Sequence, residues 1–177
     1  MPRVNAVQKK GKAMLLSERS SRKQGHSRKI LAVVDSSPEC ERAVAYAAAQ
    51  AESTHGGLVL LYVIDDSDFR QMFGVEHVMR AEAADHARAA MAAAAAIVKS
   101  RYAIKPEEII REGEAIKEIT ALVEKDSDIA LLVLAAGTYH DGPGPLIQAL
   151  VGRHKAFALP VTVIPANLSD ATIDEIA

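Results

Sequence analysis

From Lys29 onward, short apolar runs alternate with longer segments of helical character, and this alternation constrains the fold more than any other feature of the chain. The runs are rich in valine, isoleucine and leucine, which is typical of buried parallel strands, and they are residues 30–35, 58–64, 108–111, 129–135 and 161–164. The segments predicted to be helices are 39–54, 75–102, 115–125 and 146–157. This order predicts one α/β domain over residues 29–165, a doubly wound five-stranded parallel sheet with helices on both faces.

Local signals refine this outline. Ser37 and Pro38 are expected to be the N-cap and the first residue of the first helix. The long alanine-rich helix is expected to bury a stripe that begins at Val75 and Val78. The weakly apolar run 108–111 is expected at the sheet edge.

The two ends of the chain lack such patterning. Residues 1–28 hold eight lysines and arginines and one glutamate, whereas the whole chain has a net charge of −2, so a basic segment precedes an acidic domain. We expect a disordered arm that adds little to stability. Four interpretations of this arm remain open: a solvated extension, residues that precede the true initiator Met14, a tail that binds an anionic partner, or a transit peptide. Residues 166–177 are expected to form a loose polar tail.

Composition limits the class of protein. A chain of 177 residues with one cysteine, Cys40, can form one good core and no intramolecular disulfide, which favours a reducing, cytoplasmic location. No apolar run approaches the roughly 20 residues of a membrane span. We do not expect a nucleic-acid partner, because short basic runs such as that of the arm are common and the domain is acidic. Cys40 is expected near a helix N-terminus, either as core filler or as a stabilised thiolate.

The sequence lacks the common phosphate-binding loops and the nucleophile motif of α/β-hydrolases. It has no G-x-x-x-x-G-K-[ST], no G-x-G-x-x-G after the first strand and no G-x-S-x-G elbow. None of its six histidines has a metal-binding spacing to another histidine or to the cysteine. We therefore expect no metal site and no catalytic residues.

The loop after the fourth strand is the remaining candidate for a binding site. It is rich in glycine and leads into a helix, which together offer backbone N–H groups to an anion. Pro143 and Pro145 lack an N–H, so Arg153 would have to supply compensating charge. Alternatively, the loop is a rigid turn and Arg153 forms a surface salt bridge.

With these features the chain resembles the universal stress protein family over residues 29–165. Members that bind ATP have a glycine at the end of the fourth strand, a second glycine after two residues, nine further residues, and a glycine followed by Ser or Thr. Here Gly142 and Gly152 keep the spacing of nine, but four residues separate Gly137 from Gly142, and Arg153 replaces the Ser or Thr. The strand ending in Asp35 and the runs 61–65 and 160–164 also resemble the family.

The resemblance implies a regulatory protein of the stress response that binds ATP or AMP between strands one and four, with Mg²⁺ beside ATP. Asp35 would face the adenine or ribose, unless it only caps the following loop, and Val63 would contact adenine through its backbone. The remaining implied contacts are Ala136, Gly137, Gly142, Gly144, Gly152 and Arg153. Slow ATP hydrolysis occurs in some relatives.

A second interpretation is a dimeric interaction module that has lost its nucleotide and docks to a regulatory protein partner. The longer glycine spacing and the two prolines favour it. In either case the short apolar run 161–164 is expected at a sheet edge, where it would pair with a second copy to form a homodimer. Phe69, Met72 and Phe73 are expected to cover the crevice, contact a partner or pack on the second helix.

Overall fold

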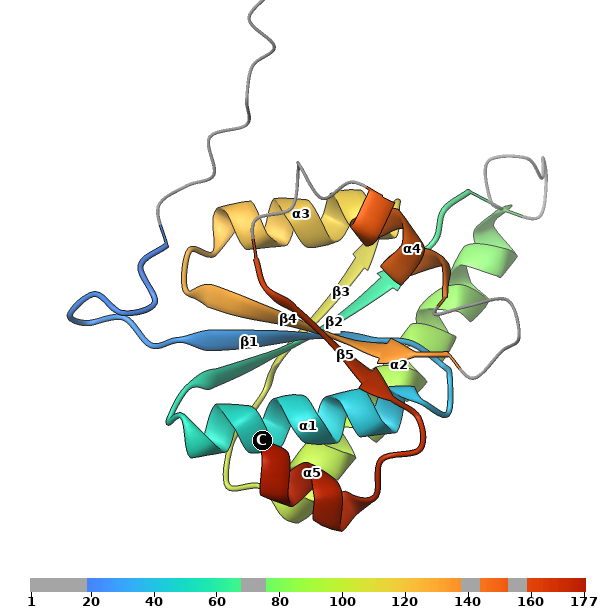
Figure 1. The fold of residues 1–177 in the computed structure, drawn as a ribbon. Helices are drawn as coiled ribbons and strands as arrows, with labels where there is room; N and C mark the ends of the chain where they lie inside the picture. The colour runs from blue at the N-terminus through green and yellow to red at the C-terminus, as the bar shows by residue number, and fades with distance from the viewer. Residues whose placement is uncertain (1–18, 68–75, 138–143, 153–158) are drawn as a thin grey trace, which may run out of the picture.

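The computed structural model describes residues 19–67, 76–137, 144–152 and 159–177, and within them the chain forms five strands and five helices (Figure 1). The strands are β1 (Lys29–Val34), β2 (Gly57–Ile64), β3 (Glu107–Glu112), β4 (Ile129–Ala136) and β5 (Val161–Pro165). The helices are α1 (Cys40–Ser53), α2 (Glu76–Arg101), α3 (Ala115–Lys125), α4 (Pro145–Gly152) and α5 (Asp170–Ile176). The predicted order of elements is confirmed. Phe69, Met72 and Phe73 lie outside the described residues.

The strands form one parallel sheet in the order β3-β2-β1-β4-β5. The chain passes from β1 to β2 and β3 on one side, and then crosses to place β4 on the other side of β1. The strand order therefore reverses beside β1, and β3 and β5 lie at the two edges. The predicted fold class is confirmed.

Both faces of the sheet are covered, as Figure 1 shows. On one face Ile30, Ala32 and Val34 pack with side chains of α1 and α2. On the other face Leu31 and Val33 pack with side chains of α3 and α4. Burial of successive β1 residues on opposite faces explains why this strand is apolar throughout rather than alternating.

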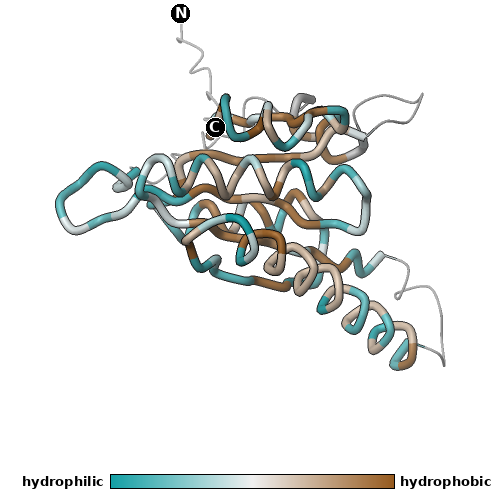
Figure 2. Tube along the Cα trace, turned by 90° about the horizontal axis from the view of Figure 1, so that it is seen from below, coloured by the Kyte–Doolittle hydropathy of each residue, from teal (hydrophilic) through white to brown (hydrophobic). Residues whose placement is uncertain are grey.

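Helix α2 is only partly embedded in the domain. Its buried residues are Ala87, Met91, Ala94 and Val98, all in its C-terminal two-thirds. Figure 2 shows the other end of the helix projecting past the rest of the domain. The expectation that Val78 is buried is wrong: its side chain is 60% exposed, because the sheet does not extend beneath this end of α2. None of the helices in the described segments has the length and apolar character needed to cross a bilayer.

The prediction of a disordered basic arm is wrong for residues 19–28, which lie against the turn between α3 and β4. The Arg19 guanidinium donates from Nη1 to the carbonyl oxygens of Val123, Asp126 and Ile129 at 2.7, 3.1 and 3.4 Å. A cation at the C-terminus of a helix satisfies free carbonyls and complements the helix dipole. Ser20 is buried, and its hydroxyl donates to the Asp128 carboxylate at 2.6 Å.

The C-terminal segment also differs from the expected loose tail. Ser169 caps α5 by accepting a hydrogen bond from the Thr172 N–H at 3.1 Å. Ile173 is completely buried, and Asp170 pairs with Arg42 of α1 and with Arg101 of α2. One buried isoleucine and these ion pairs hold α5 on the same face of the sheet as α1 and α2.

We predict that Arg19→Ala lowers the free energy of unfolding by about 1–3 kcal/mol, because it removes charge-assisted hydrogen bonds from three partly buried carbonyls. Arg22→Ala is the matched control, since Arg22 is exposed and makes no hydrogen bond or ion pair with a described residue. Urea unfolding followed by circular dichroism measures both. Equal stability of the two variants would contradict this docking of the arm.

Candidate functional site

A cavity of about 230 Å³ lies at the carboxyl ends of β1 and β4, where the strand order reverses. Open α/β sheets bind their ligands at this position. The lining comes from the ends of the two strands, the β1–α1 loop and the start of α4: Val33, Asp35, Ser37, Glu39, Leu134, Ala135, Gly137, Gly144, Leu146 and Ile147. The predicted crevice between strands one and four is therefore present as a cavity.

The β1–α1 loop is held by its own hydrogen bonds. The Asp35 carboxylate accepts from the Ser37 N–H through Oδ1 at 2.8 Å, and the Ser37 carbonyl accepts from the Cys40 N–H at 3.2 Å. Asp35 thus caps the loop and lines the cavity at the same time. Helix α1 begins at Cys40, so the predicted Ser37 cap and Pro38 start are wrong: Ser37 belongs to a turn that precedes the helix.

The start of α4 forms the opposite wall. Gly144 has a φ of +99°, a conformation that other residues rarely adopt, and its carbonyl accepts from the Gln148 N–H at 3.1 Å. The first N–H groups of a helix have no acceptor within the helix. Pro145, the first residue of α4, has no backbone N–H. Leu146 and Ile147 therefore supply the N–H groups at this end of the cavity.

Glu39 is a lining residue that the sequence interpretation missed. Its side chain is only 4% exposed, and it lies at the N-terminus of α1. A signal for its burial was present, because Glu39 precedes Ala43 and Ala47 at the spacing of four that marks the buried face of α1. With Asp35 it places two carboxylates, and no basic side chain, among the described residues of the lining.

The predicted contact residues fall into three groups. Asp35, Gly137 and Gly144 line the cavity together. Val63 on β2 and Ala136 on β4 pack against the core under α3 and α4 and do not line it, and Gly152 is the last residue of α4. Gly142 and Arg153 lie outside the described residues.

Cys40 is core filler and not a stabilised thiolate. It is 5% exposed, its Sγ accepts from the Asp35 N–H at 3.4 Å, and burial raises the pKa of the thiol to about 11. In the described ranges, no three His, Cys, Asp or Glu side chains form a group that could hold a metal ion.

Comparison with protein families gives a direct identification. Residues 26–154 match the model of the universal stress protein family, and the chain belongs to this family. No protein among the curated sequences matches it significantly.

Solved structures agree with this assignment. The chain is 26% identical to the universal stress protein UspA from Lactobacillus plantarum, with a TM-score of 0.67 over 77% of this chain and 97% of the other. Two structures share the fold at lower identity. A universal stress protein in complex with cAMP is 17% identical, with a TM-score of 0.56 over 79% of this chain and 98% of the other. The universal stress protein from Archaeoglobus fulgidus in complex with dAMP is 16% identical, with a TM-score of 0.56 over 77% and 97%.

We predict that the native protein reacts with iodoacetamide at pH 8 more slowly than the urea-unfolded chain by a factor of about 100 or more. Raising the thiol pKa from 9.0 to about 11 reduces the thiolate fraction by that factor, and burial slows the reaction further. The pKa of the Cys40 thiol is higher in the folded protein than in the unfolded chain. Its contribution to the free energy of unfolding is therefore complete below pH 9 and is lost as the pH rises toward 11. Equal alkylation rates for native and unfolded protein would contradict the burial of Cys40.

Proposed function

We propose that the protein is a regulator of the stress response that binds an adenine nucleotide in the cavity between β1 and β4. The observation that carries this proposal is the convergence of Asp35, Gly137 and Gly144 on one cavity where the strand order reverses. The cAMP and dAMP complexes of structures with the same fold support it.

In this proposal the two ends of the cavity hold different parts of the ligand. One Asp35 oxygen is used by the Ser37 N–H, and the other would accept a hydrogen bond from a ribose hydroxyl. Val33 and Leu134 would contact the base. The phosphate would lie at the N-terminus of α4, where the Leu146 and Ile147 N–H groups and the helix dipole attract an anion.

The charge of the cavity affects how many phosphates its ligand can carry. Asp35 and Glu39 repel a polyphosphate unless a cation neutralises it, and Mg²⁺ brought with ATP would do so. Arg153, which follows Gly152 in the sequence, would add a second positive charge. On the described residues alone, a ligand with one phosphate, such as AMP, is better matched to the site than ATP.

The alternative is an interaction module that docks to a protein partner without nucleotide. The buried Glu39 carboxylate and the missing N–H of Pro145 favour it, because both weaken an anion site. Nucleotide binding separates the two candidates.

We also propose a homodimer formed through β5. This strand is a sheet edge, and its Val161 and Val163 side chains are each 38% exposed, so it offers unpaired backbone groups together with apolar surface.

We predict that Val163→Lys shifts the protein toward monomer in light scattering at micromolar concentration, because a charge on this edge opposes pairing with a second copy. Val78→Lys is the matched control, since Val78 is exposed but lies on α2. A wild-type monomer, or equal dissociation of both variants, would exclude this interface.

For nucleotide binding we predict that wild type binds AMP in calorimetry and that Gly144→Ala weakens the affinity by about tenfold. A side chain at this φ strains the loop by about 1–2 kcal/mol, and relaxation would displace the donors at the start of α4. Gly25→Ala is the control, because Gly25 has a φ of +86°, an equally open surrounding and a position outside the cavity.

Absence of heat with both AMP and ATP at millimolar concentration would remove the nucleotide proposal and leave the interaction module. Equal weakening by both glycine variants would show that the effect is general destabilisation and not a change at the site.

A further inference from the structure

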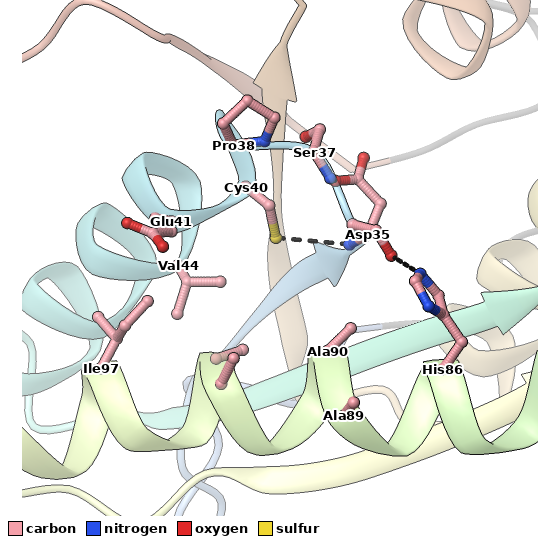
Figure 3. Close-up of a pocket in the computed structure, with 13 residues that line it drawn as sticks. Asp35, Ser37, Pro38, Cys40, Glu41, Val44, His86, Ala89, Ala90 and Ile97 are labelled. Atoms are coloured by element: carbon pink, nitrogen blue, oxygen red, sulfur yellow. Dashed lines mark hydrogen bonds between the residues drawn. The ribbon is translucent and has the colours of Figure 1, made fainter.

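Ser36 and His86 form a close pair of side chains outside the proposed nucleotide site. Ser36 lies in the β1–α1 loop and His86 lies on α2, 50 residues further along the chain, so no local sequence motif marks the pair. The Ser36 Oγ is 2.5 Å from the His86 Nε2, and Figure 3 shows the His86 ring reaching across to this loop. Both residues are exposed, so a molecule from solvent can reach them. A hydroxyl within hydrogen-bond distance of an imidazole is the arrangement that activates a serine as a nucleophile.

The backbone offers a hydrogen-bond donor beside the same hydroxyl. The neighbouring N–H groups are already used, since that of Asp35 donates to the Cys40 Sγ and that of Ser37 donates to the Asp35 carboxylate. The Ser36 N–H donates to no acceptor in the described part of the chain. In serine hydrolases the N–H of the nucleophile is one of the groups that stabilise the oxyanion of the tetrahedral intermediate. The Ser36 N–H is therefore available for this role.

The pair lies at one end of a cavity of about 350 Å³ between α1 and α2. Figure 3 shows the two walls, with Val44 on α1 and Ala90 and Ile97 on α2. Ala90 follows His86 by four residues, so it lies one turn further along the same face of α2. An apolar group of a few carbon atoms, attached to a carbonyl held at Ser36, would cover these apolar side chains.

From this geometry we propose that Ser36 and His86 are a catalytic dyad that hydrolyses esters of short apolar carboxylic acids, with the acyl group in the cavity between α1 and α2. The Ser36 hydroxyl donates to the His86 Nε2, loses its proton to that nitrogen and attacks the ester carbonyl carbon through Oγ. The ester C–O bond then breaks, His86 protonates the departing alcohol, and the acyl group remains on Ser36. Water attacks this acyl group with His86 as the base, which releases the carboxylic acid and returns a proton to Ser36.

Turnover is expected to be slow. A catalytic triad has a third group that orients the histidine, whereas no carboxylate in the described segments hydrogen-bonds to His86. The substrate must therefore carry a good leaving group. The activity does not depend on the proposed nucleotide binding, since neither Ser36 nor His86 lines the cavity between β1 and β4.

Covalent labelling tests the nucleophile directly. Phenylmethanesulfonyl fluoride sulfonylates a serine that a base assists, and fluoride leaves. We expect mass spectrometry of the labelled full-length protein to place one adduct on Ser36. Ser36→Ala should abolish this adduct, and His86→Gln should slow its formation about tenfold or more, because glutamine cannot take up the proton. The matched controls are Ser67→Ala and His77→Gln, which change an exposed serine in a loop and an exposed histidine on α2 that do not line the cavity.

The length of the acyl chain tests the role of the cavity. Hydrolysis of p-nitrophenyl acetate and p-nitrophenyl butyrate is measured relative to Ser36→Ala, which corrects for reaction with other surface groups. Ala90→Leu should slow butyrate hydrolysis about tenfold and leave acetate hydrolysis nearly unchanged, because the larger side chain fills the space of the longer acyl group. Ala93→Leu, at an exposed lining position, gives the same test if Ala90→Leu does not fold.

The proposal is overturned if the label lies on other residues, if His86→Gln and His77→Gln are labelled equally fast at Ser36, or if wild type and Ser36→Ala hydrolyse both esters at the same rate. An unchanged ratio of butyrate to acetate hydrolysis in the folded cavity variant would exclude the cavity as the acyl site. None of these results affects the nucleotide proposal, because the substituted residues do not line the cavity between β1 and β4.

Discussion

Strand β1 lies between β2 and β4 with helices over both of its faces, and all of its residues from Ile30 to Val34 are buried. A strand in this position must be apolar on both sides, and it fixes where its neighbours run. Because the chain continues to β2 on one side and returns to β4 on the other, the segments that leave β1 and β4 diverge at their carboxyl ends. The cavity with Asp35, Gly137 and Gly144 follows from this divergence, and the same arrangement separates α1 and α2 from α3 and α4.

The β1–α1 loop borders the cavity between β1 and β4 and also the cavity of about 350 Å³ between α1 and α2 (Figure 3). Asp35 and Ser37 contribute to the lining of both, and the hydrogen bond between their Oδ1 and N–H fixes the loop from within. The Ser36 contact with His86 attaches the same loop to α2, whose buried residues begin only at Ala87. A nucleotide bound between β1 and β4, as proposed above, would therefore contact a loop that also borders the cavity between α1 and α2.

The sequence predicted the features that local patterns encode. The strands and α3 were predicted within one or two residues, because runs of β-branched residues and a single apolar stripe define them. Asp35 and Gly137 were expected at this end of the sheet through the family resemblance, and both line the cavity, while their contact with a ligand stays a prediction. The docked arm was missed because the acceptors of Arg19 lie 104 to 110 residues away, and no local pattern contains such a contact. Helix α5 was missed because Ile173 is its only buried side chain, too little to produce a helical period. Glu39 was overlooked although its spacing from Ala43 carried the information.

The cavity between β1 and β4 is the proposed ligand site, and the other inferences about nucleotide binding depend on it. The most direct test is the mapping of amide chemical shifts of the ¹⁵N-labelled full-length protein during titration with AMP. We expect the largest shifts at Asp35, Gly137, Gly144 and Leu146, with little change on α5 or on β3. Saturable shifts confined to other surfaces, or none at millimolar AMP, would contradict it.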